Sequence, residues 1–180
     1  IGLFKKLILV PIFATFSETV YHHDKIFELS QIESWIGVIA YSLELYFDFS
    51  AYADIAIGIG FIFGVRLPVN FNSPYKAISI GEFWRKWHIT LHLFFKDYIY
   101  KPFCNRFDFT FNSQLSAIFL VGIISGIWHG NHLGFLVWST GHSFLLAIEF
   151  FLSKSFSHSQ KSLRSETVDK LSRILRTLLV

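Results

Sequence analysis

Hydrophobic residues gather into four stretches along the chain, with polar segments between them. The stretches run from Leu7 to about Phe16, from about Trp35 to Val65, from Leu115 to Trp128 and from Leu133 to Leu152. The second exceeds the ~20 residues that one straight membrane-spanning helix needs, and the polar-containing run YFDFSAYAD interrupts it. We therefore predict a broken helix or a helical pair hinged between Asp48 and Asp54. The third and fourth stretches predict two helices joined by a turn from His129 to His132.

The segment between the second and third stretches carries most of the polar residues. Two prolines and two asparagines between Arg66 and Tyr75 break any helix. From about Gly81 to Tyr100 the pattern predicts an amphipathic or re-entrant helix with one cationic and one largely aromatic side. The cationic side holds Arg85, His88, His92 and Lys96, and the other holds Trp84, Trp87, Leu91, Phe94 and Tyr98. Such a helix lies in the membrane interface or forms a basic wall beside an anionic ligand, and periodicity leaves both open.

Composition decides the class of protein. The chain is 52% hydrophobic and 19% aromatic but only 16% charged, with 22 phenylalanines and 5 tryptophans. A soluble chain of this length would expose large apolar patches, which soluble monomers avoid. We therefore predict an all-α polytopic membrane protein. The alternative is a phenylalanine-rich soluble oligomer.

Basic residues and the chain ends suggest how the chain is organised. Three parts of the chain are net basic: Lys5 and Lys6, residues 66–106, and residues 154–176. Their charge predicts that these parts face the cytoplasm. We expect residues 1–152 to form a transmembrane region. Residues 153–180 then form a basic amphipathic tail on anionic lipid or the start of another helix. The sequence lacks methionine and a cleavable signal peptide, so we expect it to be part of a longer protein.

Several familiar catalytic patterns are incomplete. The lone cysteine, Cys104, excludes an internal disulfide, and we expect a loop thiol without a role. His88 and His92 are four residues apart, but no third ligand is signalled, so we expect no metal site. Gly122 to Gly126 misses the spacing of a serine-nucleophile elbow by one residue.

His129 is the candidate for chemistry, because it ends the apolar run FLVGIISGIWHG. An ionisable residue at membrane depth is costly and is by default a functional-site hypothesis. In a dry pocket, His129 would act as a general base on a hydroxyl that attacks an activated acyl group. Asp48 follows Glu44 by one helical turn; the pair would share a proton, bind a cation or meet Arg85. The alternative is an internal hydrogen-bond network, which we favour for Glu44. His142 and Glu149 share a helix face and would hydrogen-bond to neighbouring helices.

Three blocks of sequence resemble the membrane-bound O-acyltransferase (MBOAT) family, in particular its alginate O-acetyltransferase-like branch. They are YFDFSAYADIAIGIGFIFGVRLPVNFNSPY, then FWRKWHITLHLFFKDYIYKPF, then GIWHG. The resemblance implies long tilted helices around a tunnel and the transfer of an acyl group from a thioester to a hydroxyl. The chain departs from the family where Lys101 to Arg106 lack two usual glycines, and where Ala51 and Ala53 replace a glycine and a serine.

The resemblance also implies that residues 1–152 are a catalytic region of the MBOAT type, and it implies a set of site residues. His129 matches the essential histidine of the family and His88 its second, supporting histidine. We predict that substrates contact Arg85, Trp84, Trp87, Asp48, Asn70, Tyr75, Lys96, Trp128 and Asn131. Arg85 and Lys96 would steer an anionic donor such as acetyl-CoA or a carrier-linked acyl group, which is a co-substrate and not a bound cofactor.

The expected setting is the bacterial inner membrane, where the protein crosses the lipid several times. The expected partners are membrane lipid, the acyl donor and either a polysaccharide or a periplasmic or extracellular acyltransferase, with no nucleic acid. Two rival functions remain open. One is D-alanyl transfer toward teichoic acid, and the other is a transporter or channel with Asp48, Asp54, His129 and His142 along an ion path.

Overall fold

The computed structural model describes residues 1–21 and 29–154. These residues form helices, turns and extended segments without a β-strand, which confirms the all-α prediction. Among them, three helices are long and apolar enough to cross a membrane: Gln31–Ile62, Phe111–His129 and Leu133–Lys154. The predicted basic tail lies almost entirely outside the described residues.

The chain divides into two compact units. The first comprises Ile1–Pro74 and Arg85–Thr90, and the second comprises Tyr75–Trp84 and the chain from Leu91 onward. The short segment Arg85–Thr90 therefore belongs with the N-terminal part of the chain, although its sequence neighbours on both sides belong to the second unit.

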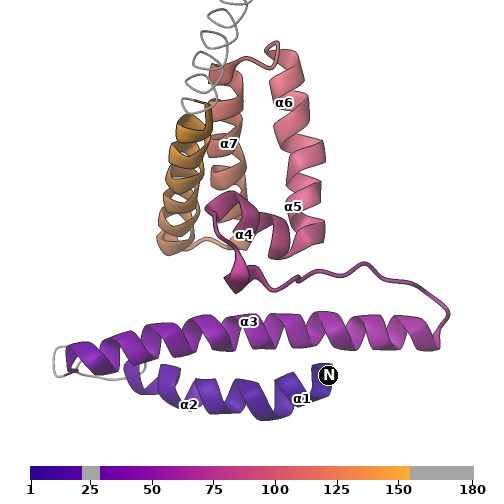
Figure 1. Cartoon of the computed structure of the whole chain (residues 1–180), viewed down its shortest axis with the longest axis vertical. Coiled ribbons are helices and arrows are strands. Elements are labelled where there is room, and N and C mark those ends of the chain that lie inside the picture. The colour runs from indigo at the N-terminus through magenta and orange to yellow at the C-terminus, as the bar shows by residue number, and fades with distance from the viewer. Residues whose placement is uncertain (22–28, 155–180) are drawn as a thin grey trace, which may run out of the picture. The chain divides into compact units, whose positions relative to one another are not determined.

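In the first unit, two antiparallel helical segments lie side by side (Figure 1). One is the continuous run of α1 (Gly2–Phe4), the π-helical η1 (Lys5–Leu9) and α2 (Val10–Tyr21). The other is α3 (Gln31–Ile62), which begins with a capping box between Ser30 and Glu33. The backbones approach closely, since a Cβ atom on Gly37 would overlap the side chain of Val20. Small residues thus set the distance between these helices.

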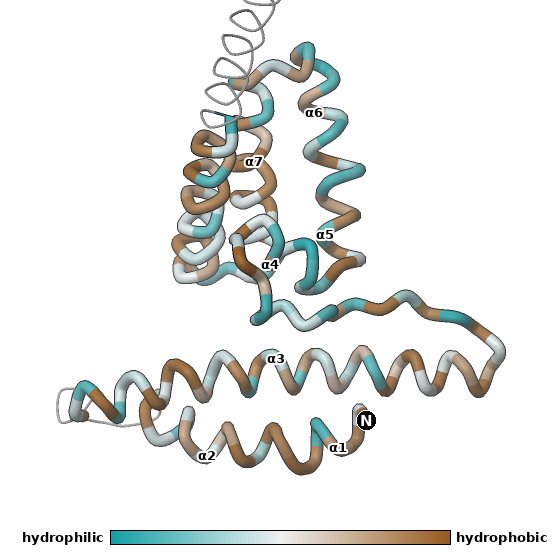
Figure 2. Tube along the Cα trace, viewed as in Figure 1, coloured by the Kyte–Doolittle hydropathy of each residue, from teal (hydrophilic) through white to brown (hydrophobic). Residues whose placement is uncertain are grey.

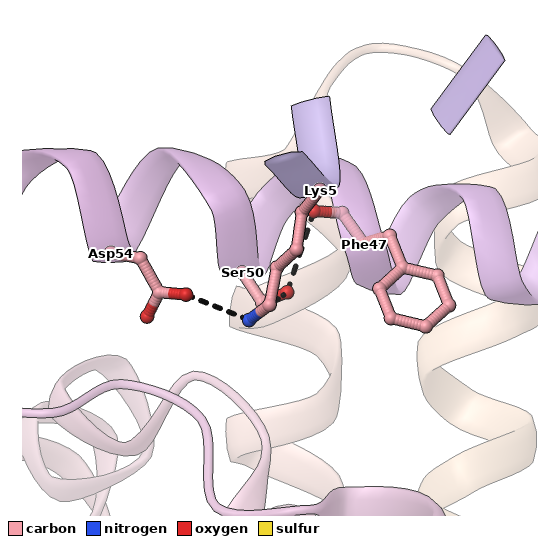
Figure 3. A network of polar contacts seen from close by, with 4 residues as sticks. All are labelled: Lys5, Phe47, Ser50 and Asp54. Atoms are coloured by element: carbon pink, nitrogen blue, oxygen red, sulfur yellow. Dashed lines mark hydrogen bonds and ion pairs between the residues drawn. The ribbon is translucent and has the colours of Figure 1, made fainter. Parts of the chain in front are cut away.

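The predicted break in the second apolar stretch is wrong, because α3 is one helix of 32 residues. Lysines of the neighbouring helical run neutralise the carboxylates that we interpreted as a hinge. Lys5 Nζ lies 2.8 Å from Asp54 Oδ2, and Lys6 Nζ lies 2.5 Å from Asp48 Oδ1. Lys5 Nζ also donates a hydrogen bond of 3.2 Å to Ser50 Oγ (Figure 3). Paired in this way, the two aspartates stay within an apolar helix without interrupting it.

Short helices follow α3. After the extended segment that the prolines predicted come η3 (Pro74–Lys76), α4 (Ile80–Lys86), α5 (Ile89–Phe95), the π-helical η4 (Lys96–Tyr100) and α6 (Lys101–Arg106). The predicted single amphipathic helix is therefore wrong: it breaks at Trp87 and His88, where His88 has a φ of 43°. The four cationic residues do not share one helical face. Cys104 is also not in a loop, since it is fully buried in α6.

The second unit contains the predicted helical hairpin of α7 (Phe111–His129) and the Leu133–Lys154 helix. The turn at residues 130–132 is confirmed. The helices meet at small residues, with Gly122 beside Ser143 and Gly126 beside Ser139. Large apolar side chains such as Ile127 and Leu145 point outward, 62% and 50% exposed. Hydrophobic residues recur along both helices (Figure 2), as expected for helices that face lipid.

Candidate active site

His129 is the last residue of α7, and three aromatic side chains lie around its ring. Ring centroids are 4.9 Å away for Trp128, 5.3 Å for Trp138 and 5.8 Å for Phe135. Gly130 ends the helix with a φ of 146°, a conformation that favours glycine. A Cβ atom there would lie 3.2 Å from the Phe135 ring. The glycine therefore allows the turn that brings Phe135 and Trp138 back to the imidazole.

The His129 side chain is exposed within the part of the chain that the structure describes. These residues alone do not form the dry pocket that we expected. Aromatic rings support the imidazole on several sides, and the Trp138 ring meets it at an interplanar angle of 90°. The imidazole is thus supported on several sides and remains exposed among the described residues.

The aromatic contacts extend from Trp138 to a second histidine. His142 lies 5.2 Å from Trp138 and 5.2 Å from Trp84, measured between ring centroids, and Trp84 lies 5.7 Å from Trp138. We call Trp84, His129, Trp138 and His142 the aromatic cluster. Trp84 was predicted as a site residue, but Trp138 and His142 were not assigned to the site. Their spacing of four on one helix is the sequence signal that places them on a shared face.

Two polar atoms of the aromatic cluster are buried without a hydrogen-bond partner among the described residues. They are Trp84 Nε1 and His142 Nδ1. A buried polar group without a partner costs about 1 to 3 kcal/mol, so few native groups remain in this state. The two atoms belong to rings in direct contact, so two unsatisfied polar groups lie close together.

A hydrogen bond between a backbone N–H and a carboxylate positions Trp84. Glu149 Oε2, on the Leu133–Lys154 helix, accepts a hydrogen bond of 2.9 Å from Gly81 N at the start of α4. Glu149 was expected to bond to a neighbouring helix, and this contact confirms it. The bond satisfies one of the free N–H groups of the first turn of α4. It thereby fixes the helix that carries Trp84 beside His142.

His88 lies in the first unit, at the break between α4 and α5. Its ring contacts Phe49 edge-on at 4.8 Å between centroids and lies 6.4 Å from Phe71. With a φ of 43°, it occupies a left-handed backbone conformation that costs a non-glycine residue about 1 to 3 kcal/mol. Strained residues of this kind cluster at functional sites.

Asn70 holds the strained backbone around His88. Its side-chain oxygen accepts hydrogen bonds from Thr90 N at 3.0 Å and Thr90 Oγ1 at 2.7 Å. Its backbone carbonyl accepts from Ile89 N at 2.9 Å, and Asn72 N donates to Lys86 O at 3.0 Å. Bonds on both sides of His88 thus fix the kink. In the structure, the Asn70 amide oxygen is engaged with α5, and we expect it to position His88.

The remaining predicted site residues are divided between the units. In the first unit, Trp87 packs on Phe71 and Tyr46, Asp48 pairs with Lys6, and Arg85 is exposed. In the second, Tyr75 packs on Phe83, while Lys96, Trp128 and Asn131 are exposed. The structure therefore brings Trp84 and Trp128 together with the surroundings of His129. It places His88, Asn70 and Trp87 together around Phe71.

A sequence profile of the membrane-bound O-acyltransferase family matches residues 3–176. The chain belongs to this family. Peptidoglycan O-acetyltransferase of Helicobacter pylori is 43% identical over 163 residues, which cover 89% of the chain and 29% of that protein. Probable alginate O-acetylase of Pseudomonas aeruginosa is 43% identical over 117 residues, covering 65% and 22%.

The chain also resembles a protein whose name gives a different activity. Teichoic acid D-alanyltransferase of Bacillus subtilis is 32% identical over 124 residues, which cover 63% of the chain and 30% of that protein. The chain thus spans less than a third of the length of each of these three relatives.

Proposed function

We propose that the chain is the part of a membrane-bound O-acyltransferase that carries its general base. The full-length protein moves an acyl group, most simply acetyl, from a thioester to a hydroxyl of an exported polysaccharide, of peptidoglycan or of a relay protein. The observation that carries this proposal is His129 at the open end of α7, held among aromatic rings within the block GIWHG. The similarity to two O-acetyltransferases supports acetyl as the group.

The chemistry follows from an imidazole that is supported but accessible. His129 accepts the proton of the acceptor hydroxyl as its oxygen attacks the thioester carbonyl carbon. The carbon–sulfur bond then breaks, and the departing thiolate takes up the proton. No covalent enzyme intermediate is required. Positioned proton transfer of this kind contributes about 10² to 10⁴ in rate.

Other residues have supporting roles in this proposal. His88 orients or polarises the thioester, and Asn70 holds its backbone. Arg85 and Lys96, both exposed cations, attract an anionic donor such as acetyl-CoA or a carrier-linked acyl group. The site faces its acceptor from the bacterial inner membrane.

The direct test is acyl transfer from a labelled thioester by the full-length protein in membranes. We expect His129→Gln to lower the rate by about 10² to 10⁴ at matched expression, since glutamine cannot act as the base. The matched control is His132→Gln, three residues away in the same turn. His132 is exposed, and its Nδ1 accepts a hydrogen bond from nearby Gly134 N, at 3.2 Å. Unchanged transfer by His129→Gln would reject the assignment.

D-alanyl transfer is the second candidate, and the similarity to the Bacillus subtilis protein favours it. It uses the same attack on a thioester and differs in the acyl group. Competition between acetyl and D-alanyl thioesters in the same assay separates the two. A transporter finds less support, because Asp48 and Asp54 are neutralised by lysines of the adjacent helical run.

A further inference from the structure

The strongest feature outside the proposed proton transfer is a pair of atoms in the aromatic cluster, Trp84 Nε1 and His142 Nδ1. Neither has a hydrogen-bond partner within residues 1–21 and 29–154. Their rings are in contact at 5.2 Å between centroids and nearly perpendicular, at 83°. The two atoms come from different helices, α4 and the Leu133–Lys154 helix. A hydrogen bond from Gly81 N to Glu149 Oε2 joins these helices, so the relative positions of the two rings are fixed by contacts within this unit.

The chemistry of the two atoms limits what can bind them. An indole nitrogen only donates, and an imidazole nitrogen donates in one tautomer and accepts in the other. The partner of Trp84 must therefore be a hydrogen-bond acceptor. A carbonyl oxygen has two lone pairs and can accept from both nitrogens at once, as in an oxyanion hole.

The position of the pair connects it to His129. Trp138 contacts the rings of both histidines, at 5.3 Å from His129 and 5.2 Å from His142. Trp138 is itself 39% exposed and contacts the rings of both histidines, so the buried pair lies one side chain away from the exposed His129. One tryptophan thus separates the candidate base from two unused hydrogen-bonding atoms.

We propose that Trp84 Nε1 and His142 Nδ1 form a binding site for the carbonyl oxygen of the acyl donor, beside His129. This inference rests on the proposed acyl transfer and assigns the group that receives the negative charge. As the acceptor oxygen bonds to the carbonyl carbon, the C=O electron pair moves onto the oxygen held by the two nitrogens. His129 holds the proton meanwhile. Collapse of the tetrahedral intermediate re-forms C=O and breaks the carbon–sulfur bond. His129 then gives the proton of the acceptor hydroxyl to the departing thiolate.

Binding of two coenzyme A thioethers by the full-length protein tests this site without catalysis. One probe carries a 2-oxopropyl group, which presents a ketone oxygen, and the other carries a propyl group, which lacks it. We expect wild-type protein to bind the ketone about five- to tenfold more tightly, because hydrogen bonds form only with that probe. Trp84→Phe keeps an aromatic ring but removes the N–H, and it should abolish most of this preference.

Matched variants separate hydrogen bonding from packing. His142→Asn places an amide near the position of Nδ1 and should retain the preference, whereas His142→Leu should lose it. Trp35→Phe removes an indole N–H from an exposed position on α3, 69% exposed, and should change nothing. Trp84→Phe should unfold at the temperature of wild type or above, because a buried unpaired donor has been removed.

Transfer kinetics complete the test. Trp84→Phe should lower kcat by tenfold or more and change the KM of the donor less, as expected for a contact that strengthens in the transition state. Equal binding of both probes by wild type, or a preference that survives Trp84→Phe, would overturn the site. Loss of folding in parallel with loss of preference would show a packing role and also overturn it. A ketone preference in a protein without acyl transfer would keep the site and reject the proposed function.

Discussion

The backbone conformation of His88 cannot be predicted from the residues next to it in the sequence. The pattern from Gly81 to Tyr100 fits one continuous helix, yet the chain enters the left-handed region at His88 and starts a new helix at Ile89. The cause is tertiary, because residue 70 accepts hydrogen bonds from the segment after His88 and residue 72 donates one to the segment before it. Periodicity reports which side of a helix is apolar and contains no information about such distant bonds.

The strain at His88 predicts an unusual pair of variants. His88→Gly should be more stable than His88→Ala by about 1 to 2 kcal/mol, because glycine adopts a positive φ without steric cost. Both variants should lose acyl transfer to the same extent, since both lack the imidazole. Thermal unfolding and transfer rates of the full-length protein measure the two effects separately.

Ser73 provides the control for this comparison. It is exposed and has a similar φ of 48°. Ser73→Gly should likewise exceed Ser73→Ala in stability, with transfer unchanged in both. Equal stability of His88→Gly and His88→Ala would contradict the strain.

Asn70 gives a second prediction for a single residue. Asn70→Ala removes the acceptor of two hydrogen bonds from Thr90 and should destabilise the protein by about 1 to 3 kcal/mol. It should also reduce transfer by displacing His88. The control is Asn72→Ala, because Asn72 takes part through its backbone N–H and its side chain is exposed. Calorimetry and transfer assays should show a clear difference between these neighbouring substitutions.

Among the helices, the sequence predicted the hairpin well and α3 poorly. The third and fourth apolar stretches lie within α7 and the Leu133–Lys154 helix, and the turn lies at the predicted residues. The ends of these helices are determined by nearby residues, because Gly130 and its polar neighbours directly follow an apolar run. The unbroken α3 depends on Lys5 and Lys6, which are distant in sequence from Asp54 and Asp48. The carboxylates are visible in the sequence, but their partners are not.

The spacing of Gly122 and Gly126 contains a packing signal that we tested only as a catalytic motif in the sequence. Tested as a nucleophile elbow, the segment fails, but glycines four residues apart are a packing motif of membrane helices. A Cβ atom on Gly126 would overlap Ser139 Oγ and would lie 3.1 Å from the backbone at Leu136 Cα. The motif therefore sets how closely α7 approaches the next helix.

This packing makes Gly126→Ala destabilising, by about 1 to 3 kcal/mol, because an added methyl group forces the helices apart. Gly141→Ala is the matched control on the partner helix, where a Cβ atom meets nothing within 4 Å. That substitution should be neutral or stabilise by up to about 1 kcal/mol through helix propensity. Comparison of thermal unfolding in detergent would contradict the interface if both substitutions behaved alike.

For the molecule as a whole, composition indicated the class of protein and three spaced blocks indicated its family. Neither showed how the predicted site residues are shared between two units, His88 in one and His129 in the other. That division arises because Arg85–Thr90 packs with the first unit while the residues on both sides of this segment pack with the hairpin. Such an exchange over a short segment depends on contacts across the chain, which no local pattern records.

The length of α3 has a consequence for the lipid around it. A helix of 32 residues is about 48 Å long, whereas the hydrocarbon core is about 30 Å thick. Hydrophobic mismatch of this kind is met by tilting the helix or by thickening the surrounding bilayer. The ion pairs at Asp48 and Asp54 lie in the half of α3 that follows its midpoint, so a change of tilt also moves charge relative to the bilayer surface.

We therefore expect bilayer thickness to affect the transfer rate through the tilt of α3. In reconstituted vesicles whose lipids differ only in acyl-chain length, we expect the transfer rate to pass through a maximum. Replacing Lys5 and Asp54 together by an apolar pair should shift that maximum, while an exposed change such as Gly58→Ala should leave it in place. A rate independent of chain length would mean that α3 does not sense the bilayer. A maximum that shifts as expected would mean that the bilayer, through the length of α3, also sets the rate of transfer.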